Sequence, residues 1–219
     1  MERFFNTEGP VNPAKHYTIP LASRLDLDEI LNLIRREKYF LLHAPRQTGK
    51  TSALLALMDM LNTSGEYKTL YVNVESAQAA REDVAAAMQA ILASLAASAR
   101  DYLDDPFPGE IFPATLQKSG PFHALKELLT IWISKNRKPI ILFIDEIDSL
   151  VGDTLISVLR QLRAGYNNRP TQFPQSVVLC GVRDIRDYRI KSKGREVITG
   201  GSAYNIKAKS LRLGDFQKK

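Results

Sequence analysis

The sequence contains very little cysteine and histidine and no long apolar run. Its 219 residues include one cysteine, Cys180, so the chain cannot form an internal disulfide. The three histidines, His16, His43 and His123, are scattered, and no set of His and Cys has metal-ligand spacing, so we expect no zinc site. Because no stretch of about 20 apolar residues occurs, and no apolar segment follows the first residues, we expect a soluble, cytoplasmic protein without a secretory signal.

What the sequence does contain is an alternation of strand and helix patterns. Hydrophobic residues make up 44% of the chain, enough for one domain with a substantial core. Strands are predicted at residues 39–42, 69–74, 140–144 and 176–181, with a weaker fifth at 203–208. Since helical patterns separate these strands, we expect an α/β fold, a three-layer sandwich with a mostly parallel sheet and helices on both faces.

The expected helix boundaries follow from caps and breaks. Asp26 and Glu29 have the spacing of a capping box, which predicts a helix start before the first strand. Residues 84–95 are alanine-rich with apolar residues on one face, which favours a helix. Residues 104–109 contain two prolines and a glycine and are predicted as a loop, and Pro121 marks the start of the next helix.

Residues 44–51 match a phosphate-binding loop. They are Ala-Pro-Arg-Gln-Thr-Gly-Lys-Thr, placed between a strand and a helix, and they fit G-x-x-x-x-G-K-[ST] with Ala44 in place of the first glycine. Gly49 allows a tight turn, Lys50 can contact the β- and γ-phosphates, and the Thr51 hydroxyl can bind Mg²⁺. We therefore expect a nucleoside triphosphate to contact Ala44, Pro45, Arg46, Gln47, Thr48, Gly49, Lys50, Thr51 and Ser52.

A second motif ends the predicted strand at 140–144. This apolar run is typical of a strand buried on both faces, and it is followed by Asp145 and Glu146. Asp145 would hold Mg²⁺ through a water molecule, and Glu146 would act as the general base for an attacking water. The alternative is that these acids cap the following helix, the interpretation we adopt for Asp148.

Together, the loop at 44–51 and the acidic strand end at 140–146 resemble P-loop ATPases that place a catalytic glutamate beside the metal-binding aspartate. That group includes the AAA+ proteins and the STAND signalling ATPases. More narrowly, the chain is similar to bacterial AAA-like predicted ATPases, related to origin-recognition ATPases, in residues 43–51 and 179–184. The resemblance covers about residues 17–213 and implies ATP and Mg²⁺ as ligands.

The resemblance also implies a polar sensor of the γ-phosphate after the fourth strand. That strand is apolar up to Arg183, which is similar to the arginine that STAND-type ATPases have there and differs from the Asn or Thr of AAA+ proteins. A surface arginine paired with Asp184 or Asp187 is the alternative. Arg46 has the same two interpretations, phosphate contact or solvent exposure.

The end of the chain is strongly basic. Residues 183–219 contain eleven Lys and Arg against four Asp and Glu, whereas the whole chain has a net charge of +6. The stretch 189–195 could contact nucleic-acid phosphates, or it could be a solvated mobile loop. We expect an N-terminal extension at 1–25, the ATPase domain at 26–213 and a tail at 214–219. In the resembled proteins a helical lid begins at about the position of this tail.

Two functions remain open from the sequence. In one, the protein hydrolyses ATP to drive a conformational or assembly cycle, with Glu146, Lys50 and Arg183 as catalytic residues. In the other, it is a nucleotide-gated switch or scaffold that binds ATP with little turnover. ATP or ADP is the expected ligand in both, and a second copy of the chain or another protein is the expected partner.

Overall fold

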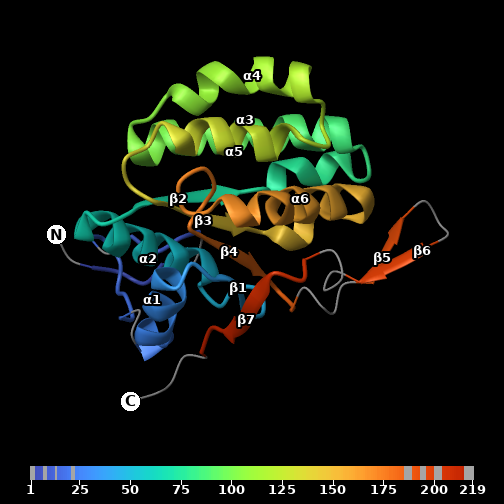
Figure 1. The fold of residues 1–219 in the computed structure, drawn as a ribbon. Helices are drawn as coiled ribbons and strands as arrows, with labels where there is room; N and C mark the ends of the chain where they lie inside the picture. Colours follow the sequence, from blue (N-terminus) through green and yellow to red (C-terminus); the bar gives the residue numbers. More distant parts are fainter. Residues whose placement is uncertain are drawn as a thin grey trace.

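A computed structural model describes residues 3–6, 9–12, 14–20, 23–184, 189–192, 196–199 and 204–214, with the backbone alone for 189–192 and 196–199. Its centre is a five-stranded, fully parallel sheet in the order β2-β3-β4-β1-β7 (Figure 1). The strand bounds are β1 Tyr39–His43, β2 Lys68–Asn73, β3 Ile140–Asp145, β4 Ser176–Gly181 and β7 Lys207–Arg212. The predicted α/β fold is therefore confirmed.

The strands form the centre because they are apolar on both faces. Every residue of β3 and β4 is buried, as expected for central parallel strands covered on both sides. Alternate residues enter two separate cores: Leu142 and Ile144 of β3 belong to one, whereas Ile141 and Phe143 belong to the other. The two cores require two helix layers.

One face is covered by α1 (Leu27–Arg35) and α2 (Lys50–Ser64), which lie side by side in Figure 1. The predicted cap of α1 is present, since Asp26 Oδ1 accepts the Glu29 N–H at 3.0 Å. Helix α2 ends at Gly65, which has a left-handed conformation.

The opposite face is covered by α3 (Val84–Leu103), α5 (Ala124–Ser134) and α6 (Gly152–Gly165). Short 3-10 turns lie at Glu75–Ala80, Ile147–Ser149 and Tyr166–Asn168. Helix α4 (Phe107–Ser119) packs outside α3 and α5 as an outer layer (Figure 1). None of the helices in the described residues combines the length and apolar character needed to cross a bilayer.

Three expectations from the sequence need correction. The loop predicted at 104–109 extends only to residue 106, because α4 begins at Phe107 with Pro108 in its first turn, where proline is tolerated. The fifth sheet strand lies at Lys207–Arg212 and not at 203–208. The stretch 189–195 is not simply a loop, since β5 (Arg189–Ser192) pairs antiparallel with β6 (Glu196–Thr199), while residues 193–195 lie outside the described residues.

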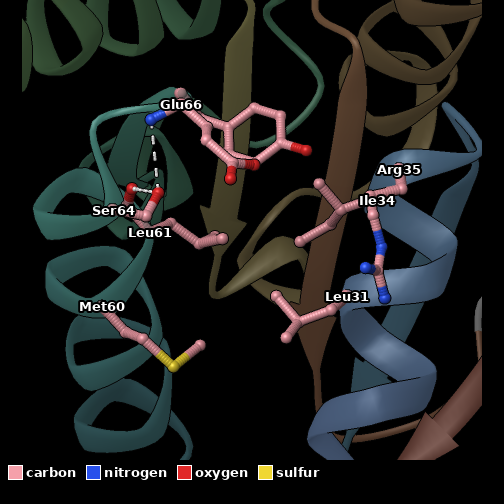
Figure 2. A pocket seen from close by; sticks show the side chains of 8 residues that line it. Leu31, Ile34, Arg35, Met60, Leu61, Ser64 and Glu66 are labelled. Carbon is pink, nitrogen blue, oxygen red and sulfur yellow. Dashed lines mark hydrogen bonds between the residues drawn. The ribbon is translucent and has the colours of Figure 1, made fainter.

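A cavity of about 200 Å³ lies between α1 and the C-terminal half of α2 (Figure 2). Its apolar wall includes Leu31, Ile34 and Leu61, and Arg35 and Glu66 lie at its edge. The phosphate-binding loop precedes the other end of α2, about 20 Å away for a helix of this length. This cavity is therefore separate from the nucleotide site described below.

Candidate nucleotide-binding site

The sheet order brings the two sequence motifs to one edge. All five strands are parallel, so the loop after β1 and the acids at the end of β3 lie at the same carboxyl edge. β4 lies between these two strands, and its last residue is bonded to the loop, with Ala44 N donating to the Gly181 carbonyl at 3.2 Å. The end of β4 thus joins the two motifs.

The loop itself is held by internal hydrogen bonds. Gly49, the N-cap of α2, has φ +78°, a conformation that costs glycine little. The Pro45 carbonyl accepts from Thr48 Oγ1 at 2.8 Å and from Lys50 Nζ at 3.1 Å. Lys50 is only 6% exposed, so its charge is held at the loop instead of extending into solvent. This arrangement presents a fixed ammonium group at a helix N-terminus, where anions bind.

Asp145 is the centre of a buried polar cluster. It is fully buried, and its Oδ2 accepts from Thr51 Oγ1 at 2.7 Å and from Tyr71 OH at 3.0 Å. A hydroxyl and a carboxylate oxygen are the ligand types that Mg²⁺ uses in nucleotide sites. The two predicted metal residues, 94 positions apart in sequence, are therefore adjacent, and this donor set fits the ion.

Tyr71 is a member of this cluster that the sequence analysis missed. It belongs to β2, next to β3 in the sheet, where a tyrosine resembles any other strand residue. Burial, and secondarily the charge of Asp145, raise the pKa of the Tyr71 phenol well above its ordinary value. Tyr71 consequently remains a hydrogen-bond donor to the carboxylate at neutral pH.

Glu146 lies at a sharp turn directly after β3. Its φ is +57°, in the left-handed region that non-glycine residues rarely adopt, and its N–H donates to Asp145 Oδ1 at 2.9 Å. Burial raises the pKa of Glu146, and the charge of Asp145 raises it further, while Lys50 opposes both. Backbone strain and a raised carboxyl pKa at one residue are both features of catalytic sites.

Helix capping does not explain the three acids. α6 begins after Val151 with no side-chain cap, and Asp145 is bonded to Thr51 and Tyr71 instead. Our interpretation of Asp148 as a cap is wrong, because its Oδ2 accepts the Val182 N–H at 2.7 Å, just beyond β4. The sequence offered no sign of this contact, since it depends on the order of the strands.

The remaining predicted residues are placed as follows. Arg183 is exposed and follows β4 by two residues, while Asp184 accepts from Lys207 Nζ at 2.6 Å.

Arg46 is exposed in the loop, and its charge acts on the Asp148 carboxyl. Ser52 Oγ accepts the Val11 N–H at 3.0 Å, which ties the N-terminal segment to the start of α2.

Comparison with solved structures shows the fold. Cdc6p from Pyrobaculum aerophilum aligns with a TM-score of 0.52 and 20% identity, over 85% of this chain and 43% of that one. A structure of Drosophila ORC bound to poly(dA/dT) DNA and Cdc6 aligns with a TM-score of 0.52 and 12% identity, over 86% of this chain and 28% of that one. The chain thus spans less than half the length of either, and no curated protein matches it.

The family is shown by the sequence itself. A family model described as an AAA domain matches residues 34–188, which include the phosphate-binding loop, the buried Asp145 and the end of β4. The match covers well over half of the 219 residues. The chain therefore belongs to the AAA domain family of P-loop ATPases.

Proposed function

We propose that this protein binds ATP with Mg²⁺ at the loop after β1 and hydrolyses it to ADP and phosphate. The observation that carries the proposal is the 2.7 Å hydrogen bond between Thr51 Oγ1 and Asp145 Oδ2. It joins the phosphate-binding loop to the acidic strand end, and it aligns two oxygen ligands of the kind that Mg²⁺ prefers. When bound, Mg²⁺ would neutralise charge on the phosphate oxygens.

The side chains of the site have separable roles in this reaction. Lys50, buried at the loop, would contact the β- and γ-phosphates together with the loop N–H groups. Glu146 would accept a proton from the attacking water, and its raised pKa makes it a better base than an ordinary glutamate. Arg183 would stabilise negative charge on the γ-phosphate. We propose that the free energy of hydrolysis drives a conformational or assembly cycle with a protein partner.

The alternative is a switch that binds ATP with little turnover. Such a switch needs the phosphate-binding loop and Lys50 to bind ATP, but it needs no general base to activate water. The position of Glu146 directly after the buried Asp145 and the raised pKa of its carboxyl favour hydrolysis, because both suit a general base.

The deciding experiment compares turnover with bound nucleotide. Phosphate release at steady state and nucleotide recovered after purification are measured for the wild type and Glu146→Gln. We expect the variant to retain ATP and to lose about 10²-fold or more in turnover, the usual contribution of a general base. Glu110→Gln, on the exposed side of α4, is the matched control. A wild type that retains ATP without releasing phosphate would establish the switch.

A second candidate function is association with DNA. The excess of positive charge lies in residues 183–219, and part of that region forms the paired strands β5 and β6. One of the solved structures with this fold is a complex bound to DNA. The charge supports contacts to phosphates without base recognition.

A further inference from the structure

Two carboxylates hold the residues on either side of Arg183. One accepts a hydrogen bond from the residue before it, and the other belongs to the residue after it. Asp148, from the turn after β3, accepts the Val182 N–H at 2.7 Å. Asp184, the next residue after Arg183, accepts from Lys207 Nζ at 2.6 Å and from Ser210 Oγ, both on β7. The Asp184 and Lys207 side chains are only 13% and 9% exposed, so this pair is largely shielded from solvent. Between them, Arg183 is exposed.

The contact made by Asp148 is close-fitting. A Cβ atom on Gly181 would lie 2.3 Å from Asp148 Oδ1, so a side chain at position 181 would displace the carboxylate. The Gly181 carbonyl also accepts the N–H of Ala44, the first residue of the phosphate-binding loop. Asp148 therefore links the turn that contains Glu146 to the end of β4, and the end of β4 is in turn hydrogen-bonded to the loop.

The contact made by Asp184 extends this linkage to the edge strand. Lys207 Nζ also donates to Ser210 Oγ at 2.6 Å, so the two β7 side chains and the carboxylate form a closed triangle of hydrogen bonds. β7 pairs along its length with β1, which leads into the phosphate-binding loop. The residues before and after Arg183 are thus both fixed to elements that end at the nucleotide site.

We propose that Asp148 and Asp184 are positioning residues that fix the backbone on both sides of Arg183 and so hold its guanidinium group in reach of the terminal phosphate of ATP. This inference rests on the proposed function, because it requires ATP at the loop. It does not require hydrolysis, since a fixed arginine would also distinguish ATP from ADP. An exposed arginine side chain loses conformational entropy when it binds a phosphate. If its backbone is already fixed, the backbone loses no further entropy, so the total entropy cost of binding is smaller.

The test measures the ratio of the Kd for ADP to the Kd for a non-hydrolysable ATP analogue, with Mg²⁺ in both titrations. Arg183→Ala is expected to lower this ratio about tenfold, as one charge-assisted contact to phosphate. Asp148→Ala and Asp184→Ala are each expected to lower it about three- to tenfold, and neither is expected to lower it further in the Arg183→Ala background. Asp83→Ala is the control, because Asp83 also accepts backbone N–H groups but at the start of α3.

Two further variants separate positioning from a structural role. Asp148→Asn keeps an oxygen that can accept the Val182 N–H, so it should restore most of the ratio. Gly181→Ala leaves both carboxylates in the sequence but displaces Asp148, so it should reproduce the Asp148→Ala result. Thermal unfolding of each variant identifies any that does not fold.

The outcomes are distinct. The inference would be overturned if Asp148→Ala or Asp184→Ala still lowered the ratio in the Arg183→Ala background. It would also be overturned if Arg183→Ala left the ratio unchanged. Asp148→Asn, if as impaired as Asp148→Ala, would overturn it too, since charge and not the bond to Val182 would then matter. A wild type that binds both nucleotides without turnover removes only the proposed hydrolysis, whereas a wild type that binds neither removes both proposals.

Discussion

At the scale of single residues, the site is organised around one buried carboxylate. Asp145 is fully buried, and a charge in that position is tolerated only when hydrogen-bond donors surround it. Thr51 and Tyr71 donate from the loop helix and from β2, and the Glu146 N–H donates from the turn after β3. The same contacts that stabilise the carboxylate orient it toward the loop, so stability and the proposed metal binding have a common origin.

The first prediction concerns Lys50. Lys50→Ala should weaken binding of a fluorescent ATP analogue by about 10- to 100-fold or more, because charge-assisted bonds to phosphate are lost, while the fold persists. Lys68→Ala is the matched control, since Lys68 Nζ also makes a side-chain hydrogen bond, to Asn136, at the opposite end of the sheet. Equal affinity of the Lys50 variant and the wild type would refute the phosphate-loop assignment.

The second prediction uses the raised pKa of Glu146. A carboxyl whose pKa is higher in the folded than in the unfolded state contributes stability at low pH, and this stability is lost as the pH rises through the folded value. In metal-free and nucleotide-free protein, Glu146→Gln should therefore raise the melting temperature at pH 7 and have little effect near pH 4. A melting temperature lowered at pH 7 would contradict the assigned cause, which is burial near Asp145.

At the scale of elements, short helices and turns decide where the functional groups lie. Glu146 and Asp148 lie on either side of Ile147 at the start of the 3-10 turn Ile147–Ser149. The turn places the Glu146 backbone N–H against Asp145 Oδ1 and the Asp148 carboxylate against the Val182 N–H. Helix α4 was not evident from sequence because Pro108 and Pro113 obscure its pattern, and Pro113 stands inside the helix. Its burial against α3 and α5 compensates for the missing hydrogen bond.

The third prediction compares two helical glycines. A Cβ on Gly165, at the end of α6, would lie 2.3 Å from the buried Phe173 ring, so Gly165→Ala should destabilise the protein by about 1–3 kcal/mol through overpacking. On α4, a Cβ on Gly109 would make an ordinary 3.9 Å contact with Ala96. Gly109→Ala should therefore stabilise by about 0.5–1 kcal/mol, from helix propensity alone. Urea denaturation measures both, and variants of equal stability would contradict the packing argument.

At the scale of the whole molecule, the nucleotide site and part of the basic region lie in different parts of the fold. The phosphate-binding loop, its acids and Arg183 follow strands of the central sheet, whereas residues 189–199, with four of the eleven Lys and Arg of the basic region, lie between β4 and β7 in the sequence. Part of that region, β5 and β6, forms a pair outside the central sheet (Figure 1). Nucleotide binding and any contact with nucleic acid are therefore expected to respond to different substitutions.

The fourth prediction tests the basic region. If it contacts duplex DNA, log affinity should fall with log salt by about 0.9 per phosphate contacted, with little sequence preference. Replacing Lys191, Lys193 and Arg195 together by Ser should flatten that slope by about two to three units, without changing the affinity for ATP. Absence of binding in fluorescence anisotropy, even at low salt, would exclude DNA and favour a protein partner.

The fold class, the four main strands and the two motifs of the site could be predicted from the order of the amino acids. This was possible because periodic burial and a phosphate-binding loop are local patterns: residues 44–51 need only a strand before them and a helix after them. The outer helix α4 and the exact place of the edge strand were not determined, since packing overrides their local signals.

The contacts between distant residues, in contrast, follow from how the strands are arranged in the sheet. The bond from Tyr71 to Asp145 depends on β2 pairing with β3, and the bond from Val182 to Asp148 depends on β4 lying beside β3. Strand order is a long-range property that no local window contains, and hydrogen bonds between distant segments form only once that order is fixed. The chemistry of the loop could therefore be predicted from the sequence, whereas the neighbours of Asp148 and Arg183 depend on the order of the strands in the sheet.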